Sequence, residues 1–268
     1  MKILKKALIG FTILLAVVLG VACMLITFPS KAVVDYKNGD VKMIAHRGLS
    51  GLHTENTVAA FLGAAKSDYY GIETDVHVTA DGQYALFHDD NLKGMTGVDM
   101  KIAENEYGEI RSVELPDKGG DGETARYVPL LHEFVKICKD YDKQAIVELK
   151  ASFTKQQMIE IVDILDGYGM KNKTTFISFD ENNLLLLRQV YPTAHAQYLF
   201  ETATDEAIQF AIENKFDASI QFWRVLPTNV KKIHDAGLQV GCWTVDNKWQ
   251  AGLMKLYGVD YITSNILV

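Results

Sequence analysis

The chain has 268 residues, of which 48% are hydrophobic, and a formal net charge of −7. This apolar content suffices to close one substantial core, so we expect one globular domain. An acidic chain without a long run of Lys or Arg lacks the positive surface that counterion-driven binding to DNA or RNA requires. The composition therefore argues against a nucleic-acid partner, and it gives no indication of the oligomeric state.

The N-terminus differs in composition from the rest of the chain. Three lysines within the first six residues precede an uncharged, apolar stretch over residues 7–28. At 1.5 Å per residue this stretch reaches about 30 Å, the thickness of a hydrocarbon core. We therefore expect a transmembrane helix within residues 1–28 and a short tether over residues 29–40. Lysines on the cytoplasmic side predict a single-pass protein of the cell membrane, with the rest of the chain extracytoplasmic.

A cleaved signal peptide is the alternative for this segment, and the protein would then be secreted. Signal peptides normally have an apolar region of only about 7–15 residues, which favours retention. Residues 30–32 (Ser-Lys-Ala) nevertheless offer a small-residue cleavage site. A lipid anchor at Cys23 is disfavoured, because Gly20 stands where a lipid-attachment signal normally has Leu. Cys138 and Cys242 have no metal-type spacing and are expected to be buried free thiols.

From residue 41 onward, short apolar or β-branched runs alternate with longer amphipathic runs, the pattern of strand–helix units around a parallel sheet. The expected strands are 41–45, 71–78, 84–87, 144–149, 174–177, 196–199, 218–222, 239–245 and 261–263. The expected helices are 58–66, 130–141, 155–168, 181–191, 205–214, 229–236 and 249–257. We interpret the strand over residues 84–87 as the antiparallel partner of the strand before it, in a hairpin. The other eight strands are then parallel. The pattern thus predicts an α/β fold, a (β/α)₈ TIM barrel over residues 41–268.

One segment interrupts this alternation. Residues 89–127 are polar, rich in glycine and without sustained periodicity. We interpret them as a small insertion after the second strand and its return. Because the insertion follows the carboxyl end of a strand, we expect it to lie over the mouth of the barrel, where such barrels hold their active sites. It would then set the shape of the substrate pocket.

Three carboxylates are candidate metal ligands. Glu73 and Asp75 are two residues apart in an expected strand, so they share a face and point into the barrel. Two like charges in an interior are costly unless a proton or a cation neutralises one, and a hard divalent metal suits them. Glu148 ends the next parallel strand and can complete an all-oxygen site, beside Lys150, which can bind a phosphate oxygen. The other interpretations are an acidic strand face in water and a strand-end salt bridge.

Two histidines are candidate acid–base groups. His46 ends the first strand and His88 ends the hairpin return, so both can reach one mouth. Near neutral pH such a pair can act as general base and general acid, each contributing about 10²–10⁴ in rate. Arg47 and Gly48 follow His46 in the sequence. The planar guanidinium group of Arg47 can bind phosphate through two nitrogen atoms, and Gly48 permits a sharp turn of the backbone. A lone histidine at a strand end is more often structural, so the pair is the informative feature.

An ordered set of motifs resembles the glycerophosphodiester phosphodiesterase family. The matching runs are Ile44-Ala45-His46-Arg47-Gly48, Glu55-Asn56-Thr57, Glu73-Thr74-Asp75-Val76, Asp81-Gly82, Phe87-His88-Asp89, Thr96-Gly97, Val128-Pro129-Leu130-Leu131, Glu148-Leu149-Lys150 and Trp243-Thr244-Val245. No single run is decisive, but the set in this order is specific and covers the chain from residue 41 onward. One departure is Ile266, which follows Asn265 where the family usually has Pro.

The resemblance implies a (β/α)₈ barrel that hydrolyses a glycerophosphodiester to glycerol 3-phosphate and an alcohol. A divalent cation, Mg²⁺ or Ca²⁺, would be bound by Glu73, Asp75 and Glu148. His46 matches the expected base, and His88 the acid that protonates the leaving group.

By the same resemblance, the substrate and its phosphate would contact Arg47, Lys150 and Trp243. The substrate itself would be a small-molecule or lipid-derived diester.

Two other functions compete with this interpretation. A phospholipase D-like enzyme on the same barrel would act on lysophospholipids or sphingolipids at the membrane surface. A non-catalytic, anchored barrel would bind anionic head groups. Both histidines and all three carboxylates argue against the second, since a binding protein needs no acid–base pair.

Overall fold

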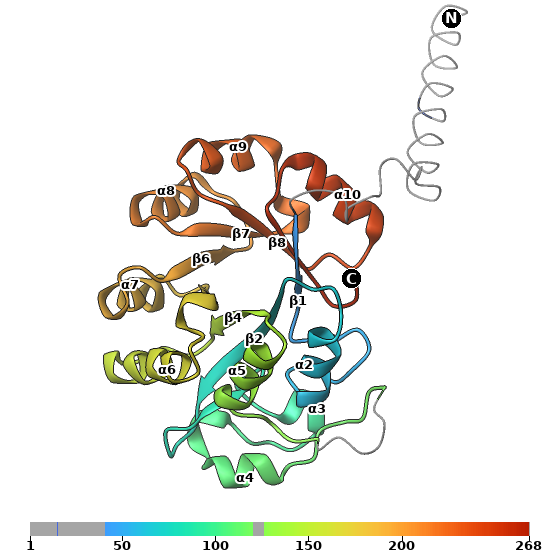
Figure 1. Cartoon of the computed structure of the whole chain (residues 1–268), viewed down its shortest axis with the longest axis vertical. Helices are drawn as coiled ribbons and strands as arrows, with labels where there is room; N and C mark the ends of the chain where they lie inside the picture. Colours follow the sequence, from blue (N-terminus) through green and yellow to red (C-terminus); the bar gives the residue numbers. More distant parts are fainter. Residues whose placement is uncertain (1–14, 16–40, 120–125, 268) are drawn as a thin grey trace, which may run out of the picture.

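The computed structural model describes residues 15, 41–119 and 126–267. Its nine-stranded sheet contains one antiparallel strand, β3 (Tyr84–Leu86), which returns along β2. The other strands are parallel: β1 (Lys42–Ala45), β2 (Gly71–Val78), β4 (Gln144–Leu149), β5 (Thr174–Ser178), β6 (His195–Phe200), β7 (Asp217–Gln221), β8 (Val240–Trp243) and β9 (Tyr261–Ser264). Because β1 pairs with both β2 and β9, these eight strands close into a barrel (Figure 1). The predicted (β/α)₈ architecture is confirmed.

A ring of helices surrounds the barrel (Figure 1). The helices that connect the parallel strands are α2 (Val58–Ala65), α5 (Leu131–Asp140), α6 (Lys155–Gly167), α7 (Glu181–Val190), α8 (Asp205–Asn214), α9 (Pro227–Asp235) and α10 (Lys248–Tyr257). Thr57, Thr154 and Thr204 cap the backbone at the start of their helices with a side-chain oxygen. Such caps satisfy amide groups that a helix start leaves free. The predicted bounds hold to within one or two residues; α9 begins two residues early, at Pro227, whose fixed φ suits a first turn.

The barrel interior is built in layers, because alternate residues of each strand point inward. Ile44, Ile146, Ile177 and Leu199, from four different strands, form one apolar cluster inside the barrel. The residues two positions later lie one layer nearer the carboxyl ends of the strands: His46, Glu148, Phe179 and Glu201. An apolar floor thus supports a layer of polar and aromatic side chains.

The insertion does not lie over the mouth, and that prediction is wrong for the described residues 89–119 and 126–127. It folds into α3 (Lys93–Thr96), η2 (Ile102–Glu104) and α4 (Tyr107–Ser112), at the outer edge of the molecule near α2 and α5 (Figure 1). Its apolar side chains Leu92, Ile102, Ile110 and Leu115 form a separate core with Ala85 of β3 and with Phe87 and Val128, which flank the insertion. Burial of these side chains against the β2–β3 hairpin is favourable and draws the segment outward.

The predicted transmembrane segment, residues 1–28, and the tether to residue 40 lie outside the described residues, except for Leu15. Among the helices that the structure does describe, none is both long and apolar enough to cross a membrane.

Candidate active site

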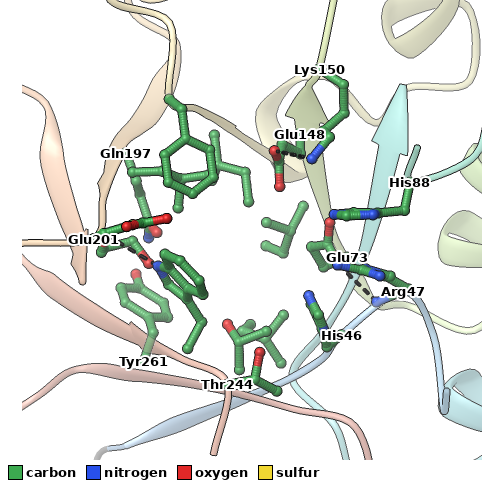
Figure 2. Close-up of a pocket in the computed structure, with 18 residues that line it drawn as sticks. His46, Arg47, Glu73, His88, Glu148, Lys150, Gln197, Glu201, Thr244 and Tyr261 are labelled. Carbon is green, nitrogen blue, oxygen red and sulfur yellow. Dashed lines mark hydrogen bonds and ion pairs between the residues drawn. The ribbon is translucent and has the colours of Figure 1, made fainter. Parts of the chain in front are cut away.

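A cavity of about 300 Å³ opens at the carboxyl ends of the barrel strands. Every parallel strand contributes to its wall, directly or through the residue that follows it. Six of the predicted site residues on this wall are labelled in Figure 2: His46, Arg47, Glu73, His88, Glu148 and Lys150. Trp243 also lines the cavity. The described part of the insertion contributes no lining residue. The structure therefore brings residues that are nearly 200 positions apart in the chain into one pocket, at the end of the barrel where the sequence placed it.

The three predicted metal ligands meet because β2 and β4 are adjacent and in register, with Asp75 opposite Glu148. One oxygen from each of Glu73, Asp75 and Glu148 lies within 4.8 Å of the others. Glu73 and Asp75 are 2% and 1% exposed. Their Oε1 and Oδ1 atoms are buried and have no hydrogen-bond partner among the described residues. Buried acceptors without a donor are costly, and a divalent cation among the three oxygens would satisfy them.

The three carboxylates have pKa values that differ from the usual values of Asp and Glu. Burial, together with the charges of Asp75 and Glu148, raises the pKa of Glu73 well above its usual value. Burial and the charge of Asp75 raise the pKa of Glu148 to about 7. Burial alone would also raise the pKa of Asp75, but the charges of Arg47 and Lys150 outweigh it, and the pKa is lowered. In the chain alone the three groups cannot all be ionised without cost, which is the situation that a bound cation reverses.

Two positive side chains flank the carboxylates. Lys150 places its Nζ atom 3.2 Å from Glu148 Oε1 and 3.9 Å from Asp75 Oδ1. Arg47 Nε lies 3.4 Å from Asp75 Oδ2, and Arg47 Nη1 donates to Glu55 Oε1 at 2.9 Å. The backbone N–H of Arg47 also donates to Glu73 Oε2 at 2.7 Å. Positive charge is therefore fixed at the edge of the carboxylate cluster, beside the cavity.

The sharp turn after β1 makes this arrangement of Arg47 feasible. Arg47 itself has a φ of 52°, and the next residue, Gly48, has a φ of 76°. A Cβ atom on Gly48 would lie 2.6 Å from the carbonyl carbon of Ala60 in α2. Only glycine fits this close approach between the loop and the helix at that backbone conformation.

His46 is held by a hydrogen-bond chain that determines its tautomer. Its Nδ1 atom lies 2.8 Å from Asn265 Oδ1, which also accepts a hydrogen bond from Ser50 Oγ at 2.8 Å. Asn265 Nδ2 donates to Asp246 Oδ2 at 2.6 Å, which fixes the orientation of the amide. Nδ1 of His46 must therefore donate, which leaves Nε2 as an acceptor on the pocket side (Figure 2). Burial and the charge of Arg47 lower the pKa of His46 to about 4, so the ring is neutral near pH 7.

His88 has a different environment. Its Nδ1 atom lies 2.7 Å from Asp89 Oδ1, and its side chain is 33% exposed. An ionised carboxylate can only accept, so Nδ1 of His88 carries a proton and Nε2 is available on the pocket side. The Nδ1 atoms of the two rings thus have different partners. His46 contacts a neutral amide, that of Asn265, whereas His88 contacts a carboxylate, that of Asp89.

Several residues of the site had no role assigned from the sequence, and five of them matter for its geometry and charge. Asn56, part of a family motif but without an assigned role, is buried; its Nδ2 donates to Asp75 Oδ2 at 2.8 Å, and its Oδ1 accepts from Thr74 Oγ1 at 2.8 Å. Asp246 and Asn265 follow β8 and β9 and position His46. The other two are Phe179 and Glu201, on the cavity wall. The sequence did carry a signal for this last pair, because each residue stands two positions after an inward-pointing apolar residue of its strand, Ile177 in β5 and Leu199 in β6.

Comparison with known proteins identifies the family of the chain. The family model for the glycerophosphoryl diester phosphodiesterase family matches residues 46–266. Glycerophosphodiester phosphodiesterases of Caldanaerobacter subterraneus and Bacillus altitudinis are 26% and 29% identical to the chain, over 83% and 82% of it and 93% of each relative.

Solved structures share the fold. A structure from Silicibacter pomeroyi has 26% identity and a TM-score of 0.76, covering 84% of this chain and 90% of that one. A phosphodiesterase of Oleispira antarctica, solved with the product sn-glycerol-3-phosphate, has 22% identity and a TM-score of 0.74, covering 84% and 92%. The chain therefore belongs to the glycerophosphoryl diester phosphodiesterase family, whose members are phosphoric diester hydrolases.

Proposed function

We propose that this enzyme hydrolyses glycerophosphodiesters to sn-glycerol 3-phosphate and an alcohol, with a divalent cation at Glu73, Asp75 and Glu148. The observation that carries the proposal is the pair of buried carboxylate oxygens on Glu73 and Asp75 that accept no hydrogen bond from any described residue, beside two positively charged side chains and two histidines. The product named for the Oleispira antarctica structure is consistent with this substrate class.

Mg²⁺ or Ca²⁺ suits the site, because all three ligands are hard oxygen donors and no Cys or His of the described residues joins them. When bound, such a cation supplies Lewis acidity to a phosphoryl oxygen. Arg47 and Lys150 add positive charge where the pentacoordinate phosphorus species gathers negative charge. Both are held by carboxylates of the cluster, so they are in place before the substrate arrives.

Proton transfer is assigned to the two histidines. Nε2 of neutral His46 accepts the proton of the attacking hydroxyl, whether this belongs to water or to the glycerol moiety. Nε2 of His88 donates a proton to the leaving alcohol oxygen, and Asp89 balances the charge of the protonated ring. The assignment follows from the partners: a buried, neutral ring suits the base, and a ring beside a carboxylate suits the acid.

A lysophospholipid or sphingolipid substrate is the second candidate, because part of the cavity wall is apolar. Ile44, Ile146, Ile177, Leu199 and Phe179 line it. An acyl chain could follow this wall, and a membrane anchor would bring the pocket to lipid.

One turnover assay tests both candidates. The purified full-length protein in detergent would be given glycerophosphodiesters and lysophospholipids, with and without a chelator. We expect release of sn-glycerol 3-phosphate that depends on the cation. Preferential turnover of lysolipids would favour the second candidate. No turnover of any diester with Mg²⁺ or Ca²⁺ present would overturn the proposal and leave the head-group-binding barrel.

A further inference from the structure

Glu201 places a negative charge on the side of the cavity opposite the catalytic residues. It follows β6, and Figure 2 shows it across the pocket from His46, Arg47 and His88. Within the described residues no hydrogen bond or ion pair holds its carboxylate. The only Lys and Arg side chains described on the cavity wall are Lys150 and Arg47, and both already contact the carboxylate cluster. A carboxylate that lines a binding cavity without a protein partner is free to pair with a ligand.

Three aromatic side chains line the same cavity, Phe179, Trp243 and Tyr261, and two of them lie against each other. Phe179, which follows β5, and Trp243, at the end of β8, contact each other edge to face, with ring centroids 5.5 Å apart and an interplanar angle of 87°. The indole N–H of Trp243 donates to the carbonyl oxygen of Ser219 at 3.3 Å, which fixes its ring. The face of an aromatic ring carries partial negative charge and attracts cations, above all quaternary ammonium groups.

We propose that Phe179, Trp243 and Glu201 form a subsite for the ammonium group of the alcohol half of the substrate. This inference rests on the proposed function and narrows it: the preferred diesters are those of positively charged amino alcohols, such as choline or ethanolamine. The phosphate binds at the positive side of the cavity, near Arg47 and Lys150. The cationic end of the alcohol binds at the aromatic and acidic side.

A neutral polyol fits this subsite less well. Its hydroxyl groups need both donors and acceptors, but ring faces offer neither and the Glu201 carboxylate only accepts. Gln197, the nearest amide on the same strand, lies two layers deeper in the barrel and is buried. Hydroxyl groups do line other parts of the cavity, on Ser219, Thr244, Tyr261 and Thr263, but the surface made by Phe179, Trp243 and Glu201 favours a positive charge over a hydroxyl group.

The direct test compares two diesters of the same shape. One is glycerophosphocholine; the other carries 3,3-dimethylbutanol, in which a carbon atom replaces the charged nitrogen. We expect kcat/KM to be about 3- to 30-fold higher for the choline diester, the range for a cation at aromatic rings. Glu201→Gln and Phe179→Leu should each reduce this ratio. Both side chains are exposed, so the substitutions leave the core intact.

Glu206→Gln is the matched control, because Glu206 is exposed on α8 and does not line the cavity. The ratio of the two diesters should stay at the wild-type value in this variant. Equal kcat/KM values for both diesters in the wild-type enzyme would overturn the subsite. So would a loss in Glu201→Gln that is the same for both.

A binding measurement separates this inference from the proposed function. Choline and 3,3-dimethylbutanol would be titrated into the full-length protein by calorimetry, where no turnover is needed. Tighter binding of choline that Glu201→Gln weakens would support the subsite even if no diester were hydrolysed, a result that would overturn the proposed function alone. Choline that binds no more tightly than its neutral analogue would overturn the subsite, whatever the enzyme hydrolyses.

Discussion

Asn265 accepts a hydrogen bond from His46 at 2.8 Å between Oδ1 and Nδ1, and it cannot turn over, because Asp246 accepts from its Nδ2 atom at 2.6 Å. The amide therefore holds His46 as the tautomer whose Nε2 atom accepts a proton. An amide also adds no charge beside the ring. This contact keeps a buried imidazole both oriented and neutral, which are the two requirements for a general base.

The first prediction concerns the pH dependence that Asn265 sets. His46 must be neutral to act, and its pKa is lowered to about 4, so the acidic limb of kcat/KM should lie far below pH 6.5. Asn265→Asp adds a negative charge that favours the imidazolium, raises the pKa of His46 and moves this limb to higher pH. The measurement is a pH–rate profile with saturating cation.

The other charges near His46 are Arg47, Asp75 and Glu55, and Asp246 lies behind Asn265, where it repels the new carboxylate. All four residues are the same in wild type and variant. The difference between the two profiles therefore reports the Asn265 contact. Superimposable acidic limbs would show that Asn265 does not act through His46.

The second prediction separates the two histidines. His46→Ala and His88→Ala should each lower turnover of a natural diester by about 10²–10⁴ without loss of cation binding. A p-nitrophenolate leaving group needs little protonation, so on a p-nitrophenyl diester His88→Ala should be far less damaging than His46→Ala. Equal losses on both substrates for both variants would remove the reason to assign the acid to His88.

The third prediction concerns the cation. Removal by a chelator should abolish activity, and Mg²⁺ or Ca²⁺ should restore it. The cation should also raise the melting temperature, because it binds buried carboxylates of the folded state. Glu73→Gln should weaken cation binding, and excess cation should partly rescue it. Full activity in excess chelator would rule out the metal site.

The fourth prediction concerns Asn56, which holds the ligand Asp75. Asn56→Ala should weaken cation affinity by about 10- to 100-fold, the usual effect of removing a hydrogen-bond partner of a ligand. Turnover at saturating cation should fall much less. Asn182→Ala, at an exposed position on α7, is the control and should leave the affinity unchanged. A variant with lower turnover but normal affinity would contradict the positioning role.

The fifth prediction concerns the N-terminal segment, which lies outside the described residues apart from Leu15. If residues 7–28 anchor the chain with their lysines inside, protease added to intact cells should digest the catalytic domain. The protein from membranes should then begin near Met1. A mature N-terminus at Ala32 or Val33 would instead identify a cleaved signal.

The sequence by itself determined the barrel and the residues that the strands deliver to its mouth. Alternation of short and long periodic runs predicted eight parallel strands, because each period follows from local backbone geometry. The spacing of Glu73 and Asp75, and the place of Glu148 on the next strand, predicted the carboxylate cluster for the same reason. His46 and His88 were predictable as residues that end their strands.

Only the tertiary structure decided what these residues contact. Asn265 reaches His46 because β9 pairs with β1 and closes the barrel, a contact between opposite ends of the chain that no local pattern encodes. Glu201 and Phe179 line the cavity because, in the closed barrel, they lie one layer above the apolar residues of their strands. The insertion lies away from the mouth because its apolar residues pack against one another and against β3. These residues are not periodic in the sequence, so no local pattern predicts the contact. Local periodicity thus fixes the direction in which a side chain points, while closure and burial fix its neighbours.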